Sequence, residues 1–427
     1  MSMRFGIQRR TRRPLALVAA AFALFALSWT ALAQEEIALR YADTMGDPMD
    51  RPGEGAVLYE LLDLFMAQNP GIKVEIVWDS DNFPVHYMGG VSPDVARFTH
   101  EPLRRHAANN MLLPLDEFVA RDQFDLSRLF PAVVNEGFRH EGRLYGMPMY
   151  FGTLAVHYNV GMFNEAGLAH PNAPAWSWET DFVEAGRKLA RDRSGDGVND
   201  QWIAAYHASN LLAPFMAARG AAFVSDDLTE WLGASPVTVD ALQWMQDQIH
   251  VRRIVAHPLA DRAAFAAGRT AFQPFGSWGL TGMHTDLTFE WALAEMPVSE
   301  LTGRRGTRWN ADGWAVSNQT QHPDAAWKLA KFISSPEAQE IIARGRLGIP
   351  VDIEVAREMF SDPETPQDET VFLRAVDYMW IDKRHETSQS TQDYIKRALN
   401  QVIDGLKPAR AAMDEITGAV TGGLASR

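Results

Sequence analysis

A strand–helix–strand pattern near the start of the chain restricts the fold more than any other feature. Residues 37–41 are typical of a short strand, and apolar residues then recur at helical spacing from 57 to 65. Residues 69–71 (NPG) end this helix, and apolar residues alternate again from 72 to 78, as in a second strand. A unit of this kind predicts a parallel sheet with helices on its faces.

The same alternation continues along the chain. Further strands are expected at residues 94–98 and 154–158, and further helices at 182–191, 325–333, 392–403 and after Pro408. Ser335 before Pro336 predicts another helix start, because serine caps helix N-termini and proline suits the first helical position. The expected fold class is therefore α/β.

Residues 1–33 have the pattern of a cleaved export signal. Five arginines within residues 4–13 precede an apolar run at 15–27, which is shorter than the roughly 20 residues of a membrane-spanning helix. Residues 31–33 (ALA) suit signal peptidase, so we expect a periplasmic protein that begins at Gln34. Residues 11–15 (TRRPL) leave the route open between the general secretory and twin-arginine pathways.

Composition excludes several kinds of site. The chain has no cysteine, which excludes disulfides, thiolate metal sites, cysteine nucleophiles and a lipoprotein anchor. Its net charge of −14 becomes −19 without the five leader arginines, so nucleic acid is not expected as a partner. A mature chain of about 394 residues exceeds what one core usually supports, so two lobes are expected. Its 13 tryptophans and nine tyrosines are rings of the kind that stack on sugars, although most aromatic residues pack in cores.

An acidic loop resembles the first half of a calcium-binding loop. Asp192, Ser194 and Asp196 stand at positions one, three and five, Gly197 follows, and Asp200 lies further on. The glutamate that such a loop carries at position twelve is replaced by isoleucine. An acidic surface turn is the favoured interpretation, and a structural calcium ion at these oxygens is the alternative. No other cofactor is expected.

Several segments occur together in a characteristic order. They are residues 92–95 (SPDV), 112–116 (LLPLD), 142–148 (GRLYGMP), 158–168 (YNVGMFNEAGL), 178–182 (WETDF), 264–272 (AFAAGRTAF), 276–278 (GSW), 312–317 (DGWAVS), 322–327 (HPDAAW) and 348–350 (GIP). In this order they resemble the family of extracellular solute-binding proteins that includes maltose-binding protein. The resemblance covers nearly the whole mature chain, and no single motif carries it alone.

The resemblance implies two α/β lobes, each a mainly parallel sheet flanked by helices, which close over a solute bound between them. It places one lobe at residues 34–150 with 311–348 and the other at 151–310 with 349–427. Hinges are expected near residues 149–152 and 310–313. The implied function is the substrate-binding component of an ABC importer, a monomer that captures a carbohydrate and delivers it to membrane permease subunits.

Trp278 is the first candidate for a ligand-binding residue. Members of the family often carry an aromatic residue of the cleft there, although a core tryptophan is the alternative. Phe98 and Glu101 follow the SPDV segment, where carbohydrate-binding relatives place an aromatic and an acid. Glu101 would accept hydrogen bonds from sugar hydroxyls, but it also suits the start of a helix, where the helix dipole favours an acid.

The remaining candidates lie at expected strand ends or crossings. Polar groups that follow the carboxyl ends of strands are favoured because α/β sheets bind ligands there. These candidates are Asp43, Thr44, Trp78, Asp79, Tyr150, Phe151, Asn210, Asp312 and Trp314. For each of them packing in the core or exposure to solvent is the alternative.

Three other functions remain open. The same fold could bind a polyol phosphate such as glycerol 3-phosphate, for which Arg51, Arg97 and Arg308 are candidates, or a polyamine or a metal. A secreted glycosidase is a second alternative, since carboxylates are plentiful, although the chain has no G-x-S-x-G, H-E-x-x-H or Walker motif. Presentation of a ligand to a chemoreceptor is the third.

Overall fold

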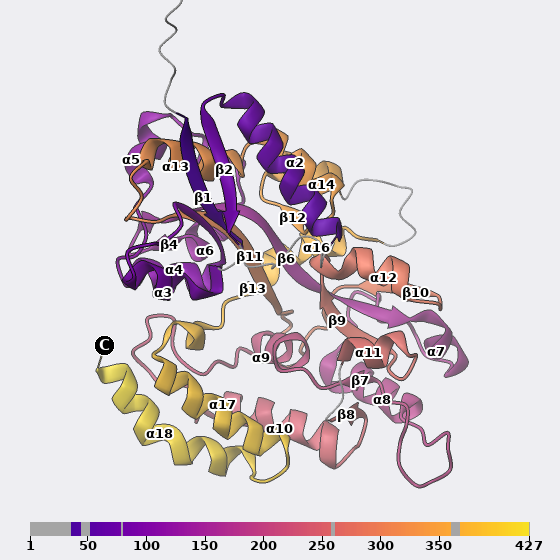
Figure 1. The fold of residues 1–427 in the computed structure, drawn as a ribbon. Coiled ribbons are helices and arrows are strands. Elements are labelled where there is room, and N and C mark those ends of the chain that lie inside the picture. The colour runs from indigo at the N-terminus through magenta and orange to yellow at the C-terminus, as the bar shows by residue number, and fades with distance from the viewer. Residues whose placement is uncertain (1–35, 44–51, 78–79, 258–260, 360–367, 427) are drawn as a thin grey trace, which may run out of the picture.

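The computed structural model describes residues 36–43, 52–77, 80–257, 261–359 and 368–426 (Figure 1). The expected signal and mature N-terminus, and the candidates Thr44, Arg51, Trp78 and Asp79, lie outside these residues. Within them, no helix combines the length and the apolar character needed to cross a bilayer.

The expected strand–helix–strand unit is present at the start of the described chain. It consists of β1 (Ile37–Ala42), α2 (Pro52–Gln68) and β2 (Ile72–Val77). β1 pairs in parallel with β2 and also with β3 (Val95–Thr99), as the sequence pattern predicts. The other expected helices and the strand at 94–98 are also present, with their ends shifted by a few residues, whereas the strand expected at 154–158 is the second half of a longer strand, Gly146–Asn159.

The remaining elements continue this alternation. The middle of the chain forms α3 (Phe83–Met88), α4 (His100–Ala108), α5 (Asp116–Arg121), α6 (Pro131–Gly137), β4 (Arg139–His140), β5 (Arg143–Leu144), β6 (Gly146–Asn159), α7 (Val160–Glu165), α8 (Val183–Leu189), β7 (Ala204–Ala205), α9 (Ala213–Arg219) and α10 (Pro236–His250). The rest forms β8 (Val255–Ala256), α11 (Asp261–Ala266), β9 (Phe272–Gly276), α12 (Leu280–Asp286), β10 (Trp291–Ala294), β11 (Thr307–Val316), α13 (Pro323–Phe332), α14 (Pro336–Arg344), β12 (Ile349–Pro350), α15 (Ile353–Met359), α16 (Val371–Arg374), β13 (Met379–Trp380), α17 (Gln389–Ile403) and α18 (Ala409–Ala425). Two short helical turns, η5 (Ala208–Leu212) and η8 (Lys383–Glu386), precede α9 and α17.

The start of α14 illustrates how local sequence determines an element. The Ser335 side chain accepts a hydrogen bond from the backbone N–H of Ala338, and Pro336 occupies the first helical position. Both features agree with the sequence prediction, because they satisfy or remove N–H groups that have no partner within the helix.

One large sheet runs through the molecule in the order β10-β6-β11-β3-β1-β2. β6 is 14 residues long; its first half pairs with β11 and its second half with β9 and β10. All of these pairs are antiparallel, so the expectation of a mainly parallel sheet in each lobe holds around β1 but not around β6. The reason is that β6 passes from one lobe to the other, and the neighbouring strands run back against it (Figure 1).

Two hydrophobic cores divide the structure into two lobes. The first core includes Leu39, Phe65, Phe98, Trp314 and Trp327. The second includes Trp178, Phe215, Phe272, Leu399 and Met413. Figure 1 shows them one above the other, with β1, β2 and α13 in the upper lobe and α10, α17 and α18 in the lower.

The packing differs from the expected lobe boundaries in two places. Away from the crossings of β6 and β11, five buried side chains from the range 151–310, which was expected in the second lobe, belong to the first core: Phe265, Leu280, Met283, Trp291 and Leu293. Ile349, Val351, Ala356, Val371 and Phe372 also belong to the first core, although residues 349–427 are expected in the second lobe. The reason is that β12 pairs with the first half of β6, which holds residues 349–372 on the upper lobe. After β13 the chain continues into the second lobe, where Gln389–Ile403 and Ala409–Ala425 form α17 and α18.

The two expected hinge segments lie side by side. Asn310 pairs with Gly152 and Asp312 pairs with Tyr150, so the crossings of β6 and β11 form a two-stranded connection. The register shifts between Asp312 and Gly313, which leaves Met149 as an extra residue on β6. Such a bulge bends its strand locally. Rotation of the lobes about this point remains a prediction.

Candidate ligand-binding site

A cavity of about 260 Å³ lies where the two lobes meet. The first lobe contributes side chains of α4, among them His100, Glu101, Arg104 and Arg105. The second lobe contributes Ser209 from η5 and Ala213 from α9. The remaining wall comes from β4, β11, β13 and the connection that follows β13, including His140, Arg308, Trp309, Trp380, Asp382, Arg384, His385 and Glu386.

Strand pairing places two of these side chains next to each other. β13 pairs in parallel with β11, and Trp380 lies directly opposite Arg308. Residues that oppose each other on neighbouring strands project to the same face of a sheet. Both side chains line the cavity. An indole face and a guanidinium group are therefore neighbours on one wall.

The rings of Trp309 and Trp380 differ in exposure and in their contacts with other rings. Trp309 is 3% exposed and stacks on the imidazole of His100, with ring centroids 4.6 Å apart and an angle of 19° between the planes. Trp380 is only half-buried, and it makes no contact with another aromatic ring of the described residues. Trp380 is thus the aromatic surface of this cavity that a flat, partly apolar ligand could cover.

Most charged side chains of the cavity are paired. Arg104 lies 2.9 Å from the carboxylate of Glu386, and this contact joins α4 to η8. Arg384 lies 2.7 Å from Asp382. The Glu101 carboxylate lies 4.0 Å from the His385 ring. Because these pairs are partly exposed, each adds at most about 1 kcal/mol of stability, and their main effect is to fix the shape of the wall.

His100 connects the cavity to the interior of the first lobe. Its Nδ1 accepts a hydrogen bond from the backbone N–H of Ala311 at 3.4 Å. Burial lowers the pKa of His100 to about 4, although the Glu101 carboxylate favours the protonated ring. The imidazole is therefore neutral at neutral pH, as its role as acceptor requires.

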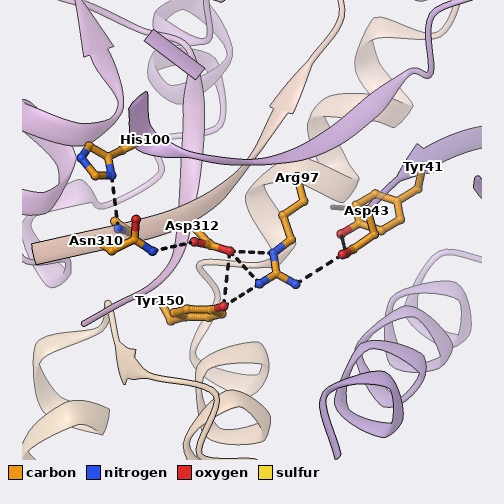
Figure 2. A network of polar contacts seen from close by, with 8 residues as sticks. Tyr41, Asp43, Arg97, His100, Tyr150, Asn310 and Asp312 are labelled. Atoms are coloured by element: carbon orange, nitrogen blue, oxygen red, sulfur yellow. Dashed lines mark hydrogen bonds and ion pairs between the residues drawn. The ribbon is translucent and has the colours of Figure 1, made fainter. Parts of the chain in front are cut away.

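Behind this wall, Arg97 is the centre of a buried polar network (Figure 2). Its Nε and Nη2 donate to Asp312 Oδ2 at 2.9 and 2.6 Å, and Nη2 donates to the Tyr150 hydroxyl at 2.5 Å. Nη1 lies 3.4 Å from Asp43 Oδ1, and the Tyr41 hydroxyl donates to Asp43 Oδ2 at 2.6 Å. All five side chains are at most 7% exposed.

The network ties together the strands that form the crossing. Arg97 is on β3, Asp43 follows β1, Tyr150 is on β6 and Asp312 is on β11. Burial raises the pKa of Tyr150 above its ordinary value, so the hydroxyl stays protonated and donates to Asp312 at 3.3 Å. The geometry indicates a structural role, because the guanidinium charge is balanced within the protein.

Comparison with known proteins identifies the family. The sequence profile described as bacterial extracellular solute-binding protein matches residues 50–340. The chain belongs to this family. It is 24% identical over 378 residues to the maltotriose-binding protein of Pyrococcus abyssi, which covers 84% of this chain and 77% of that protein.

Solved structures share the two-lobed fold of this solute-binding protein. An ABC substrate-binding protein of Listeria monocytogenes in complex with cycloalternan superposes with a TM-score of 0.78 at 22% identity, over 91% of this chain and 99% of that one. UgpB of Mycobacterium tuberculosis in complex with glycerophosphocholine gives 0.76 at 18% identity, over 91% and 98%. These likenesses confirm the expected α/β fold with two lobes.

The described candidate ligand-binding residues of this solute-binding protein occupy five different places. Glu101 lines the interlobe cavity. Three candidates, Asp43, Tyr150 and Asp312, meet in the network around Arg97. Three more, Phe98, Phe151 and Trp314, are at most 2% exposed and pack in the first core.

Trp278 and Asn210 lie elsewhere in the second lobe. Trp278 is half-buried at the edge of the second core, where it covers Gly152 and Gly276. Asn210 is 5% exposed and faces a small recess beside Thr270 and Gln273. Binding of a solute by any of these residues remains a prediction.

Sequence reasoning missed most of the cavity wall that follows β13. Trp380, Asp382, Arg384 and His385 lie beyond residues 348–350, the last segment that carries the family resemblance, so no motif identified them. Their only local signal is a tryptophan followed by a run of charged residues. The pairing of β13 with β11 brings them to the cavity, and this contact joins residues far apart in the sequence.

The acidic loop forms a network of its own on the surface. Asp192 accepts hydrogen bonds from the backbone N–H groups of Gly195 and Gly197 at 2.6 and 2.7 Å. Asp200 accepts from the backbone of Arg193 and Ser194, each at 3.1 Å, and Asp196 accepts from Val198 at 2.9 Å. Across the described residues, no group of three or more His, Asp or Glu side chains is arranged to hold a metal ion. Calcium binding here remains an expectation.

Proposed function

We propose that this chain is the substrate-binding component of an ABC importer and that it captures a carbohydrate in the cavity between its lobes. It would then deliver the solute, chemically unchanged, to permease subunits in the membrane. The observation that carries the proposal is the half-buried indole of Trp380 at a cavity built by both lobes. The names of its relatives support the choice of solute, since they bind maltotriose and cycloalternan.

The composition of the cavity suits a carbohydrate. A sugar ring has an apolar face that stacks on an indole, and hydroxyls that need donors and acceptors. Trp380 offers the face, the Glu101 carboxylate is an acceptor, and Ser209, whose hydroxyl can donate and accept, lines the cavity from the second lobe. A solute that touches both lobes stabilises the form in which they are close together.

Closure of the lobes about the crossing strands is the mechanism that this arrangement supports. The Arg97 network and the paired strands keep the crossing intact, while the cavity is formed by elements on either side of it. A ligand that binds the closed form more tightly shifts the open–closed equilibrium toward it. The permease subunits would recognise that closed form.

Thermal unfolding with a panel of sugars tests the proposal. A ligand at about a hundredfold excess over its Kd stabilises the folded state by about 2.7 kcal/mol, which raises the unfolding temperature measurably. Trp380→Ala should abolish the shift. Trp202→Ala is the matched control, because Trp202 is also half-buried but stacks with Arg269 away from the cavity. Equal loss of binding in both variants would contradict the assignment.

Four further measurements test lobe closure, release of the sugar unaltered, export and oligomeric state. Small-angle scattering should show a smaller radius of gyration with the bound sugar than without it, as lobe closure requires. Chromatography of the sugar after long incubation should return it unaltered; steady product formation would instead support a glycosidase. Sequencing of the exported protein should begin at Gln34, and light scattering should give the mass of a monomer.

A further inference from the structure

The interlobe cavity is rich in arginine although the protein as a whole is acidic. Four arginines, Arg104, Arg105, Arg308 and Arg384, face the three carboxylates of Glu101, Asp382 and Glu386. The complete chain has a net charge of −14. Basic side chains therefore outnumber acidic ones in this cavity, whereas acidic residues outnumber basic ones in the whole chain. Such a local excess of positive charge raises the local concentration of anions.

The ion pairs of the wall leave two guanidinium groups without a partner among the described residues, those of the exposed Arg105 and the half-buried Arg308. Arg104 is paired with Glu386, which also lies 3.0 Å from Lys383, and Arg384 is paired with Asp382. Within the described residues, no hydrogen bond or ion pair joins the Arg308 side chain to another group. Glu101 and Asp382 attract it electrostatically, but neither comes within ion-pair distance.

Arg308 is also partly withdrawn from water. Burial is the main cause that lowers the pKa of its guanidinium below the ordinary value, and the nearby Arg384 acts in the same direction. A partly desolvated cation without a counter-charge is unfavourable, and an anion that reached it would relieve this cost. Arginine is well suited to this, because its planar fork of N–H donors matches carboxylate and phosphate oxygens.

The position of Arg308 restricts what such an anion could belong to. Trp380 is its direct neighbour across the β11–β13 pair, and both side chains line the same cavity wall. A ring that stacks on the indole would therefore hold a charged substituent close to the guanidinium. We propose that Arg308 and Trp380 together recognise a sugar that carries an anionic group, a carboxylate or a phosphate. This inference rests on the proposed capture of a carbohydrate in the same cavity.

Matched pairs of neutral and anionic sugars test it by calorimetry. Glucose is compared with glucuronate and with glucose 6-phosphate, galactose with galacturonate, and a neutral trisaccharide with trigalacturonate. We expect the anionic member of a pair to bind at least about tenfold more tightly, which corresponds to about 1.4 kcal/mol. The uronate and phosphate arms distinguish the two sources of charge. Binding of the anionic member should also weaken as sodium chloride is raised to about 0.5 M.

Substitution of Arg308 assigns the preference to this residue. Arg308→Gln should remove the advantage of the anionic member and leave the affinity for the neutral member within about threefold. Arg308→Lys should restore part of it, because lysine keeps the charge but lacks the planar fork. Arg187→Gln is the matched control, since Arg187 is exposed on α8 and does not line the cavity. Unchanged thermal unfolding without sugar would show that each variant is folded.

The outcomes separate this inference from the proposed function. If neutral sugars bind as tightly as their anionic counterparts, or if Arg308→Gln keeps the preference, the inference is overturned while capture of a carbohydrate stands. If no member of any pair binds, both are rejected. A preference for the anionic member that is lost only in the Arg308 variants supports the inference.

Discussion

The imidazole ring of His157 is buried on β6 among aromatic rings. It stacks on Trp291 with ring centroids 5.5 Å apart, and the rings of Phe275 and Phe372 lie 6.4 and 6.1 Å away. The side chain is fully buried, and neither ring nitrogen meets hydrogen-bond geometry with a described residue. Two buried ring nitrogens that meet no hydrogen-bond geometry reduce the stability of the fold, so we expect His157→Phe to increase it.

The gain should depend on pH because burial lowers the pKa of His157 to about 4. The nearby backbone of Ala155 and Gln273 favours the protonated ring, but it offsets burial only in part. The unfolded chain takes up a proton near pH 6.5, whereas the folded protein does so only near 4. Stability from the neutral ring is complete above 6.5 and is lost as pH falls toward 4. At pH 5 this loss is about 2 kcal/mol relative to pH 7.5.

The two effects add in the variant. At pH 7.5 the removal of two unsatisfied nitrogens should raise the free energy of unfolding by about 1–3 kcal/mol. At pH 5 the advantage over the parent should grow by about 2 kcal/mol, because phenylalanine has no proton to bind in the unfolded state. The expected difference between variant and parent is therefore larger in acid than at neutral pH.

Urea unfolding followed by tryptophan fluorescence at both pH values measures these differences. His322→Gln is the matched control, since His322 is exposed, and its pH dependence should follow that of the parent protein. The reasoning is refuted if the advantage of His157→Phe is the same at pH 5 and pH 7.5. A less stable variant at both values would show that the larger ring does not fit between Trp291 and its neighbours.

Three further substitutions test the buried ion pairs of Arg97, the packing at the crossing strands and the cap of α14. Arg97→Leu leaves the buried carboxylates of its network without a counter-charge and should cost about 3–5 kcal/mol in urea unfolding; a loss below about 1 kcal/mol would contradict the buried pairing. Gly152→Ala would bring a Cβ within 2.4 Å of Trp278 Cε3 and should cost about 1–3 kcal/mol, most of which should be absent when the change is made in a Trp278→Ala background. Ser335→Ala removes the cap of α14 and should lower stability by about 1 kcal/mol, measured by thermal unfolding; an unchanged transition would show that the cap contributes nothing.

Local sequence was sufficient for most of the secondary structure. The alternation of apolar residues in β1 and β2, the helical spacing in α2, and the cap at Ser335 each depend on residues a few positions apart. Such patterns can be recognised without knowledge of the fold, because side-chain period and helix capping are local properties of the backbone. The order of several short motifs was likewise sufficient to indicate the two-lobed family.

The sequence predicts ligand-binding residues near the strand ends and the crossing strands. It does not distinguish residues that pack in a core from residues that are exposed to a ligand. Phe98, Phe151 and Trp314 were candidates for the groove, and they pack in the first core. An aromatic residue next to a strand end has the same local pattern in both cases. Its burial depends on helices and strands that arrive from distant parts of the chain.

Tertiary structure alone decided which charges are balanced and which face the cavity. Arg97 meets Asp43 and Asp312 because β3 lies between β1 and β11, so its charge is balanced in the interior. Arg308 lines the cavity beside Trp380 because β13 returns to pair with β11. The residues next to Arg97 and Arg308 in the sequence do not distinguish the two arginines. Only the pairing of distant strands gives Arg97 a structural role and leaves Arg308 at the cavity. The physical reason is that burial and charge compensation are set by neighbours in space, which the local pattern of a chain does not specify.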